Sequence, residues 1–137
     1  MEVFFYGLFM NTDILTKNGL KPSNPRKGYL NDYALKIGNR ASLIPSENEK
    51  SYGVVITVDD EAVHSLYAEA SVADYIPEEV LVVLNGNESV KAVCYNLPPE
   101  LLTGTNVSYA QSLYKLAKQN DFPEEYLMHI ESMTKGM

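Results

Sequence analysis

A glycine between a strand-like segment and a helix-like segment offers the first possibility for chemistry. Residues 3–6 are β-branched or aromatic, Gly7 follows them, and residues 9–17 have the pattern of a helix. At such a turn the backbone N–H groups have no ladder partner and lie beside the positive end of the helix dipole. This arrangement can bind a carboxylate or an oxyanion. The alternative is a plain turn in which glycine serves the backbone conformation alone.

Glu69 is the second candidate, because it lies at the margin of an amphipathic helical pattern. Val63, Leu66, Tyr67 and Ala70 follow the spacing of a buried helical stripe. At ~100° per residue, Glu69 lies about 60° from Leu66 and near the end of the helix, so we expect it to be partly buried. A carboxyl group so placed is a candidate general acid/base. The alternative is an exposed glutamate at a fraying helix end.

Other familiar sites have little support. No glycine-rich phosphate loop is present, and the two histidines, His64 and His129, are far apart in the sequence. With a single cysteine, Cys94, a zinc site is not expected and a disulfide framework is excluded. Cys94 lies in a strand-like segment and is expected to be a buried, inert thiol. Arg40 could bind a carboxylate, although a solvated surface arginine is the alternative.

Composition limits the partners. The 137 residues fit one domain, residues 1–137, and the net charge of −7 argues against nucleic acid and anionic membranes as partners. The first ten residues lack the basic region and cleavage site of a secretory signal, and no apolar run approaches the ~20 residues that span a bilayer. We therefore expect a cytoplasmic protein.

The hydrophobic pattern predicts an α+β fold, a small mixed β-barrel or sheet of about six strands with surrounding helices. Expected strands are residues 3–6, 29–37, 40–44, 52–58, 79–84 and 90–95. Expected helices are residues 9–17, about 60–70, 109–119 and one that begins near Pro123. Connections are a loop at 21–28, a polar hairpin turn at 46–51 and an Asn-Gly turn at 85–87. Asn106 or Ser108 is the expected cap of the third helix.

The two candidate features also occur together in a known family. FFYGLFM at 4–10 resembles the strand and Tyr-Gly-Ser/Thr-Leu turn of the γ-glutamyl cyclotransferase-like family, which includes avirulence-induced-gene proteins and γ-glutamylamine cyclotransferases. LYAEA at 66–70, followed by DY at 74–75, resembles its leucine, catalytic glutamate and following tyrosine. SY at 108–109 and FPEEY at 122–126 resemble its closing segment. The resemblance covers nearly the whole chain.

The resemblance implies a role for each matching residue. Glu69 would be the general acid/base, and the pocket would contain two tyrosines, Tyr75 and Tyr109, of which Tyr109 is the more direct contact. The backbone that would hold the glutamyl end of the substrate belongs to Tyr6, Gly7, Leu8 and Phe9. Two residues depart from the family pattern: Leu8 replaces a usual Ser or Thr, and Ala70 follows the glutamate where glycine is common.

The implied activity is that of a γ-glutamyl cyclotransferase, a transferase or lyase that releases 5-oxoproline from a γ-glutamyl amine or peptide. It requires a small-molecule substrate and no cofactor or metal. Two alternatives remain: a non-catalytic module that binds a small carboxylate on the same fold, and a structural interaction domain, which predicts no enclosed pocket at Glu69. The sequence indicates neither the leaving group nor the oligomeric state.

Overall fold

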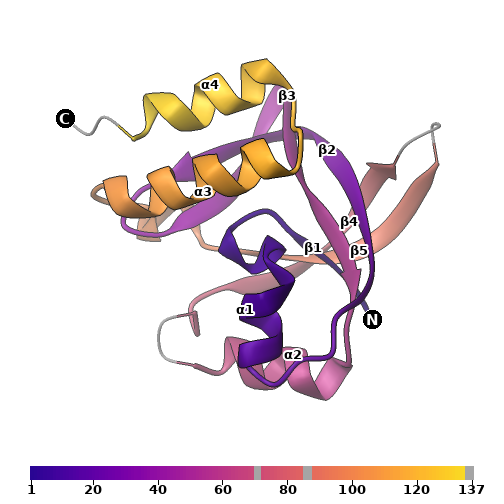
Figure 1. Cartoon of the computed structure of the whole chain (residues 1–137). Coiled ribbons are helices and arrows are strands. Elements are labelled where there is room, and N and C mark those ends of the chain that lie inside the picture. The colour runs from indigo at the N-terminus through magenta and orange to yellow at the C-terminus, as the bar shows by residue number, and fades with distance from the viewer. Residues whose placement is uncertain (70–71, 85–87, 135–137) are drawn as a thin grey trace.

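A closed β-barrel forms the centre of this computed structural model, which describes residues 1–69, 72–84 and 88–134 (Figure 1). Its strands are β1 (Glu2–Phe5), β2 (Ser23–Ile37), β3 (Ala41–Thr57), β4 (Ile76–Leu84) and β5 (Ser89–Asn96). Their order around the barrel is β1-β3-β2-β4-β5. Neighbouring strands are antiparallel except β1 and β5, which close the barrel as a parallel pair at Val3 and Val93.

Helices cover the barrel in two groups. Figure 1 shows α3 and α4 side by side above the barrel and α1 and α2 below it. The helices are α1 (Thr12–Lys17), α2 (Asp60–Tyr67), α3 (Val107–Gln119) and α4 (Glu124–Ser132), with short 3-10 turns η1 (Leu8–Met10) and η3 (Pro99–Leu101). Within the described part of the chain, no helix is long and apolar enough to cross a membrane.

Local signals place the helices near their predicted positions, although α1 begins at Thr12 rather than at residue 9 and α2 already ends at Tyr67. Val63 and Leu66 of α2 are buried, as their helical spacing requires. The Asn106 side chain accepts a hydrogen bond from Tyr109 N and caps α3, and Pro123 lies at the N-cap of α4. The α+β barrel with surrounding helices is therefore confirmed. Ala70 and the expected turn at 85–87 lie outside the described residues.

The number of strands differs from the prediction, because the expected strands at 40–44 and 52–58 are parts of one strand, β3. The predicted hairpin turn at 46–51 is wrong, because these residues continue β3. The chain reverses at residues 38–40, where the predicted strands 29–37 and 40–44 meet. The register of β3 against β2 shifts between Asn31 and Tyr33, and Asn48 has a positive φ of 66°. A bulge therefore accommodates this largely exposed run, whose polarity reflects solvent contact rather than a turn.

The predicted loop at 21–28 is also wrong in part, because β2 already begins at Ser23. The pairing of β2 with β3 shifts between Ser23 and Arg26, and Asn24 has a φ of 51°. Pro25 lies inside this irregular step, where the ladder does not need its missing N–H. Pro22 therefore precedes the strand and Pro25 lies in the bulge at its start, so neither proline interrupts the regular part of β2.

An ion pair and a hydrogen bond join the first strand to β2 and β3. Arg26 of β2 bridges to the Glu2 carboxylate of β1, which also accepts a hydrogen bond from Thr57 of β3. Burial alone raises the pKa of Glu2, but the hydrogen bonds from Thr57 and Arg26 outweigh it and hold that pKa below its ordinary value of 4.5. The charged form of Glu2 therefore stabilises the folded state.

We expect the stability that Glu2 contributes to be present at neutral pH and to be lost as the pH falls below about 4.5, through the lowered pKa of the folded state. At pH 7 the free energy of unfolding should exceed that of Glu2→Gln by up to about 1 kcal/mol, since the pair is partly exposed. Urea titrations of both proteins between pH 7 and pH 3 measure this difference. A difference that does not shrink at low pH would contradict the assignment.

Candidate functional site

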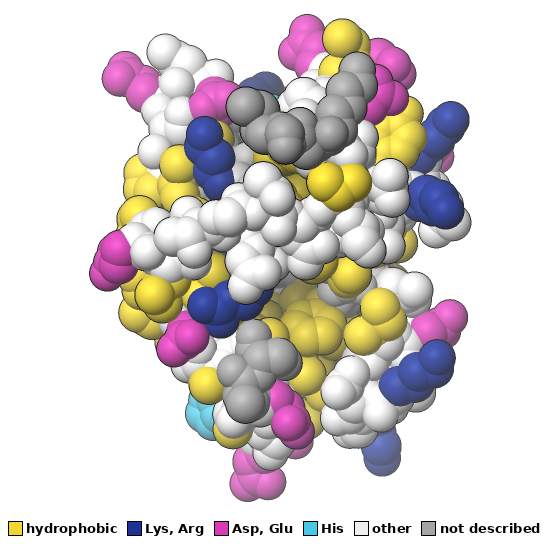
Figure 2. Space-filling model, turned by 90° about the vertical axis from the view of Figure 1, so that its left-hand side faces the viewer, with side chains coloured by type: hydrophobic (Ala, Val, Ile, Leu, Met, Phe, Trp, Pro, Cys, Tyr) yellow, Lys and Arg dark blue, Asp and Glu magenta, His cyan; other side chains and the backbone are white. Residues whose placement is uncertain are grey.

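A cavity of about 340 Å³ opens between the turn after β1, the segment after α2 and the start of α3. In Figure 2 this face is hollowed between its upper and lower halves, and the floor of the hollow is hydrophobic. The lining residues are Phe4, Phe5, Tyr6, Gly7, Leu8, Phe9, Ile14, Asn39, Arg40, Ala41, Tyr67, Val72, Tyr75, Tyr95, Asn106 and Tyr109. Every residue expected to bind the substrate therefore lines one cavity.

The backbone of the turn presents amide donors to this cavity. Leu8 N donates to the Tyr109 hydroxyl oxygen at 3.4 Å. Among the described residues, the amides of Gly7 and Phe9 have no protein acceptor. Leu8 and Phe9 belong to the three-residue turn η1, and Gly7 is its N-cap, whereas α1 begins only at Thr12 behind its own cap. The prediction that β1 leads directly into a helix is therefore wrong, and the N-terminus of α1 does not supply the donors.

Gly7 is required by a close contact rather than by its backbone conformation. Its φ of −108° and ψ of −151° are extended values that any residue adopts. A Cβ atom at position 7 would overlap with the Tyr109 hydroxyl oxygen, while the next atom, Tyr109 Cζ, would be 3.7 Å away. Tyr109 is 102 positions later in the sequence, on the first turn of α3. Only the hydroxyl group of Tyr109 therefore excludes a Cβ atom at position 7.

The tyrosines of the cavity are neutral hydrogen-bonding groups. Tyr6, at the buried floor, donates its hydroxyl to Tyr95 O at 2.8 Å. Burial raises the pKa of Tyr109 to about 12, although the Leu8 amide partly offsets this effect. Burial likewise raises the pKa of Tyr6 and of Tyr75, whose hydroxyl donates to Ala41 O. At neutral pH these hydroxyls add no negative charge that would repel an anionic ligand.

Aromatic packing fixes the wall below the turn. The Tyr67 ring at the end of α2 stacks on Tyr95 of β5, with ring centroids 3.8 Å apart and an interplanar angle of 8°. Phe9 meets Phe5 and Tyr67 edge to face, each at 6.1 Å. The sequence shows that the chain is rich in tyrosine, but it does not identify Tyr67 or Tyr95 as residues of the cavity wall. Their contact joins α2 to β5, which are far apart in the sequence.

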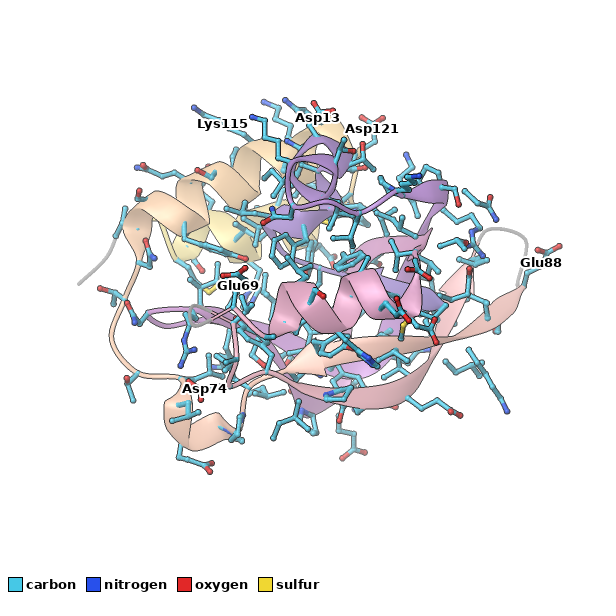
Figure 3. All side chains as sticks on the ribbon, turned by 90° about the horizontal axis from the view of Figure 1, so that it is seen from below. Asp13, Glu69, Asp74, Glu88, Lys115 and Asp121 are labelled. Atoms are coloured by element: carbon cyan, nitrogen blue, oxygen red, sulfur yellow. The ribbon has the colours of Figure 1, made fainter. Side chains whose placement is uncertain are left out.

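Glu69 differs most from its expected surroundings. Its side chain is exposed, so the prediction of partial burial is wrong. The helix α2 ends at Tyr67, and Glu69 lies one residue beyond the C-cap Ala68. Figure 3 shows Glu69 beyond this end of α2, drawn between α2 and α3 in that view. Glu69 does not line the cavity, whereas Tyr67 before it and Val72 after it do.

Arg40 is the basic side chain for which the sequence left two roles open, binding of a carboxylate or a solvated surface position. Arg40 lines the cavity together with Asn39 and Asn106. Its guanidinium Nη1 is 3.2 Å from Asp74 Oδ2 and its Cζ is 6.0 Å from the centroid of the Tyr75 ring. The sequence signal is modest, because Arg40 is simply one of two arginines and follows a short glycine-containing segment.

The remaining candidate groups do not form a metal site. Among the residues with described positions, no three His, Cys, Asp or Glu side chains come together. His129 Nε2 is 2.8 Å from Leu35 O, and His64 is exposed on α2. Cys94 is fully buried in β5, as predicted, and burial raises the pKa of its thiol far above the ordinary range.

We expect Cys94 in the native protein not to react with a chromogenic disulfide reagent, because the buried thiol is neither accessible nor ionised. The chain has one cysteine, so the absorbance change reports this residue alone. Reaction should become stoichiometric in unfolding concentrations of guanidinium chloride. A rapid reaction in native buffer would contradict the burial of Cys94.

Comparisons with known proteins agree with this fold. The sequence model of the family described as "Gamma-glutamyl cyclotransferase, AIG2-like" matches residues 3–119. A solved structure titled "Gamma-glutamyl cyclotransferase" has a TM-score of 0.77 at 19% identity, covering 97% of this chain and 87% of that one. An uncharacterised protein from Homo sapiens has a TM-score of 0.75 at 20% identity, covering 96% and 86%. A protein from Arabidopsis thaliana has a TM-score of 0.63 at 18% identity, covering 90% and 94%. No curated protein sequence matches the chain.

Proposed function

The chain belongs to the γ-glutamyl cyclotransferase, AIG2-like family, and on this basis we propose that it releases 5-oxoproline from a γ-glutamyl amine or peptide. The observation that carries the proposal is the cavity beside residues 6–9, where backbone amides and neutral tyrosine hydroxyls surround a space of about 340 Å³. Pockets of roughly 300–1,000 Å³ are typical for small molecules. The family acts on small-molecule substrates, which agrees with a cavity of this size.

The reaction is an intramolecular ring closure. The α-amine of the γ-glutamyl group attacks its own side-chain carbonyl carbon, and a C–N bond forms in the 5-oxoproline ring. The C–N bond to the leaving amine breaks, and one proton moves from the attacking nitrogen to the departing nitrogen. Holding amine and carbonyl in contact supports this step, because effective molarities of well-oriented groups can reach about 10⁵ M or more.

The turn at residues 7–9 would hold the glutamyl end. The amides of Gly7 and Phe9 can donate to the α-carboxylate or to the oxyanion that develops on the attacked carbonyl. Tyr109, whose hydroxyl accepts from Leu8 N, can redirect its own proton toward a bound ligand. The hydroxyl contact that a Ser or Thr at position 8 would add is absent, because this position is Leu8.

Glu69 is the proposed general acid/base, which takes the proton from the attacking amine and returns it to the leaving nitrogen. Its exposed position means that its carboxylate must turn into the cavity when the substrate binds. Two facts support this role: Tyr67 and Val72, on either side of Glu69, line the cavity, and catalytic contacts often tighten only in the substrate complex.

A non-catalytic module that binds a small carboxylate is the second candidate. The exposure of Glu69, outside the cavity lining, favours this function. Incubation with a panel of γ-glutamyl amino acids and γ-glutamyl amines, with 5-oxoproline measured by mass spectrometry, separates the two candidates. The enzyme proposal expects release with at least one member of the panel. Binding of a panel member without any 5-oxoproline would establish the non-catalytic module instead.

A further inference from the structure

The cavity contains one positive side chain among its described lining residues, Arg40. It follows the reversal between β2 and β3, and Ala41 begins β3 directly after it. No Asp or Glu is among the described residues that line the cavity. In a largely apolar cavity a guanidinium attracts an anion more strongly than it does in bulk water. The cavity is therefore suited to a ligand with a carboxylate near Arg40.

The protein contacts of Arg40 leave it able to bind a ligand. Its ion pair with Asp74 is a single contact of 3.2 Å, and the two side chains are 27% and 57% exposed. A guanidinium has five N–H donors, and an exposed pair of this kind contributes little to stability. The Tyr75 ring lies under the guanidinium, and its own hydroxyl is held by Ala41 O. The Tyr75 ring thus orients the guanidinium of Arg40, and N–H groups of the guanidinium remain free to donate to a ligand carboxylate.

Hydrogen bonds connect the Arg40 turn to the glycine turn. Asn39 O accepts from Asn106 Nδ2 at 3.1 Å, and Asn39 N donates to Thr103 O. Asn106 Oδ1 in turn caps α3 by accepting from Tyr109 N at 3.0 Å. Because the Tyr109 hydroxyl lies against Gly7, both ends of the cavity are set by the start of α3.

The two ends differ in depth. Tyr6 is 6% exposed at the floor beside the glycine turn, whereas the Arg40 side chain is 27% exposed. A γ-glutamyl group that binds its glutamyl end at residues 7–9 would direct its other end outward, toward Arg40. The carboxylate that reaches Arg40 is then the one on the leaving group.

We propose that Arg40 binds the carboxylate of the leaving group and makes the protein selective for γ-glutamyl amino acids over γ-glutamyl amines. This inference rests on the proposed function, since it assumes that the glutamyl end occupies the turn. Arg40 is a specificity residue in this proposal and takes no part in proton transfer.

Two substrates that differ only in this carboxylate test the proposal: γ-glutamyl-alanine and γ-glutamyl ethylamide. The wild-type protein should have a kcat/KM at least about tenfold higher for γ-glutamyl-alanine, because a charged hydrogen bond is lost with the ethylamide. Arg40→Gln should lower kcat/KM for γ-glutamyl-alanine by about 10- to 100-fold, mainly through KM. The same variant should change kcat/KM for the ethylamide by less than about threefold.

Arg26→Gln is the matched control, because it removes the other arginine of the chain, which lies at the bulged start of β2 and does not line the cavity. The ratio of kcat/KM values for the two substrates should remain that of the wild-type protein. Arg40→Lys, which keeps the charge but not the paired donors, should retain part of the selectivity.

Equal loss of both activities in Arg40→Gln, or a wild-type protein without preference, would overturn this inference and leave the proposed function intact. Absence of 5-oxoproline from both compounds and from the rest of the γ-glutamyl panel would instead overturn the proposed function. In that case, the dissociation constants of the same two compounds, measured by calorimetry, decide whether Arg40 binds the carboxylate. Tighter binding of γ-glutamyl-alanine that is lost in Arg40→Gln supports it, and equal binding overturns it.

Discussion

Replacement of Glu69 by glutamine should lower the rate of 5-oxoproline release at least about 100-fold, the lower end of what a general acid/base contributes. Glutamine has nearly the same size and cannot carry the proton between the two nitrogens. Because the Glu69 side chain is exposed, the free energy of unfolding should change by less than about 0.5 kcal/mol. Steady-state kinetics and urea denaturation of the same preparation measure both quantities.

Glu61→Gln is the control for charge, since Glu61 is an exposed acid in the first turn of the same helix, α2. It should retain the wild-type rate. Full activity of Glu69→Gln would remove Glu69 from the mechanism. Equal losses in both variants would show that the net charge of this region matters and that proton transfer at Glu69 does not.

Replacement of Gly7 by valine should weaken the binding of a γ-glutamyl ligand at least about tenfold. The new side chain would overlap with the Tyr109 hydroxyl and displace the turn that lines the cavity. Overpacking of this kind typically costs about 1–3 kcal/mol of stability. Isothermal titration calorimetry and urea denaturation measure the two effects. Unchanged affinity in Gly7→Val would count against the proposed pocket.

A double-mutant cycle identifies the atom responsible. Gly7→Ala adds only a Cβ, which overlaps with the hydroxyl oxygen of Tyr109 but lies 3.7 Å from Cζ. Tyr109→Phe removes that oxygen, so the cost of Gly7→Ala should largely vanish in the Tyr109→Phe background. Urea midpoints of the four proteins supply the coupling energy. The same cost in both backgrounds would show that the hydroxyl is not the obstacle.

The helices were predictable from the sequence because their signals are local. Asn106 caps α3 and Pro123 precedes α4, and each acts through groups within one turn of itself. The long strand β3 was not predictable, since its exposed stretch at 46–50 has the composition of a turn. Pairing with β2 on both sides of the bulge, Lys50 with Asn31 and Pro45 with Tyr33, keeps this stretch within one strand.

The site was predictable to the extent that its parts are local. The glycine turn is visible in the sequence, but its true constraint, the hydroxyl of Tyr109, comes from the other end of the chain. The position of Glu69 depends on where α2 stops, and helical periodicity does not fix that point to within one turn. Arg40 lies just after β2 ends, at the break that the predicted strands 29–37 and 40–44 already imply, but the sequence does not show that this break meets the cavity.

The group of tyrosines around the cavity, which includes the stacked pair Tyr67 and Tyr95, has a practical consequence. The chain has ten tyrosines and no tryptophan, so its ultraviolet emission comes from phenol rings without the indole band that dominates most proteins. Five of those rings, Tyr6, Tyr67, Tyr75, Tyr95 and Tyr109, border the same cavity. We therefore expect the tyrosine emission of the unlabelled protein to change when a ligand occupies the cavity, so that fluorescence can follow ligand titrations that release no product.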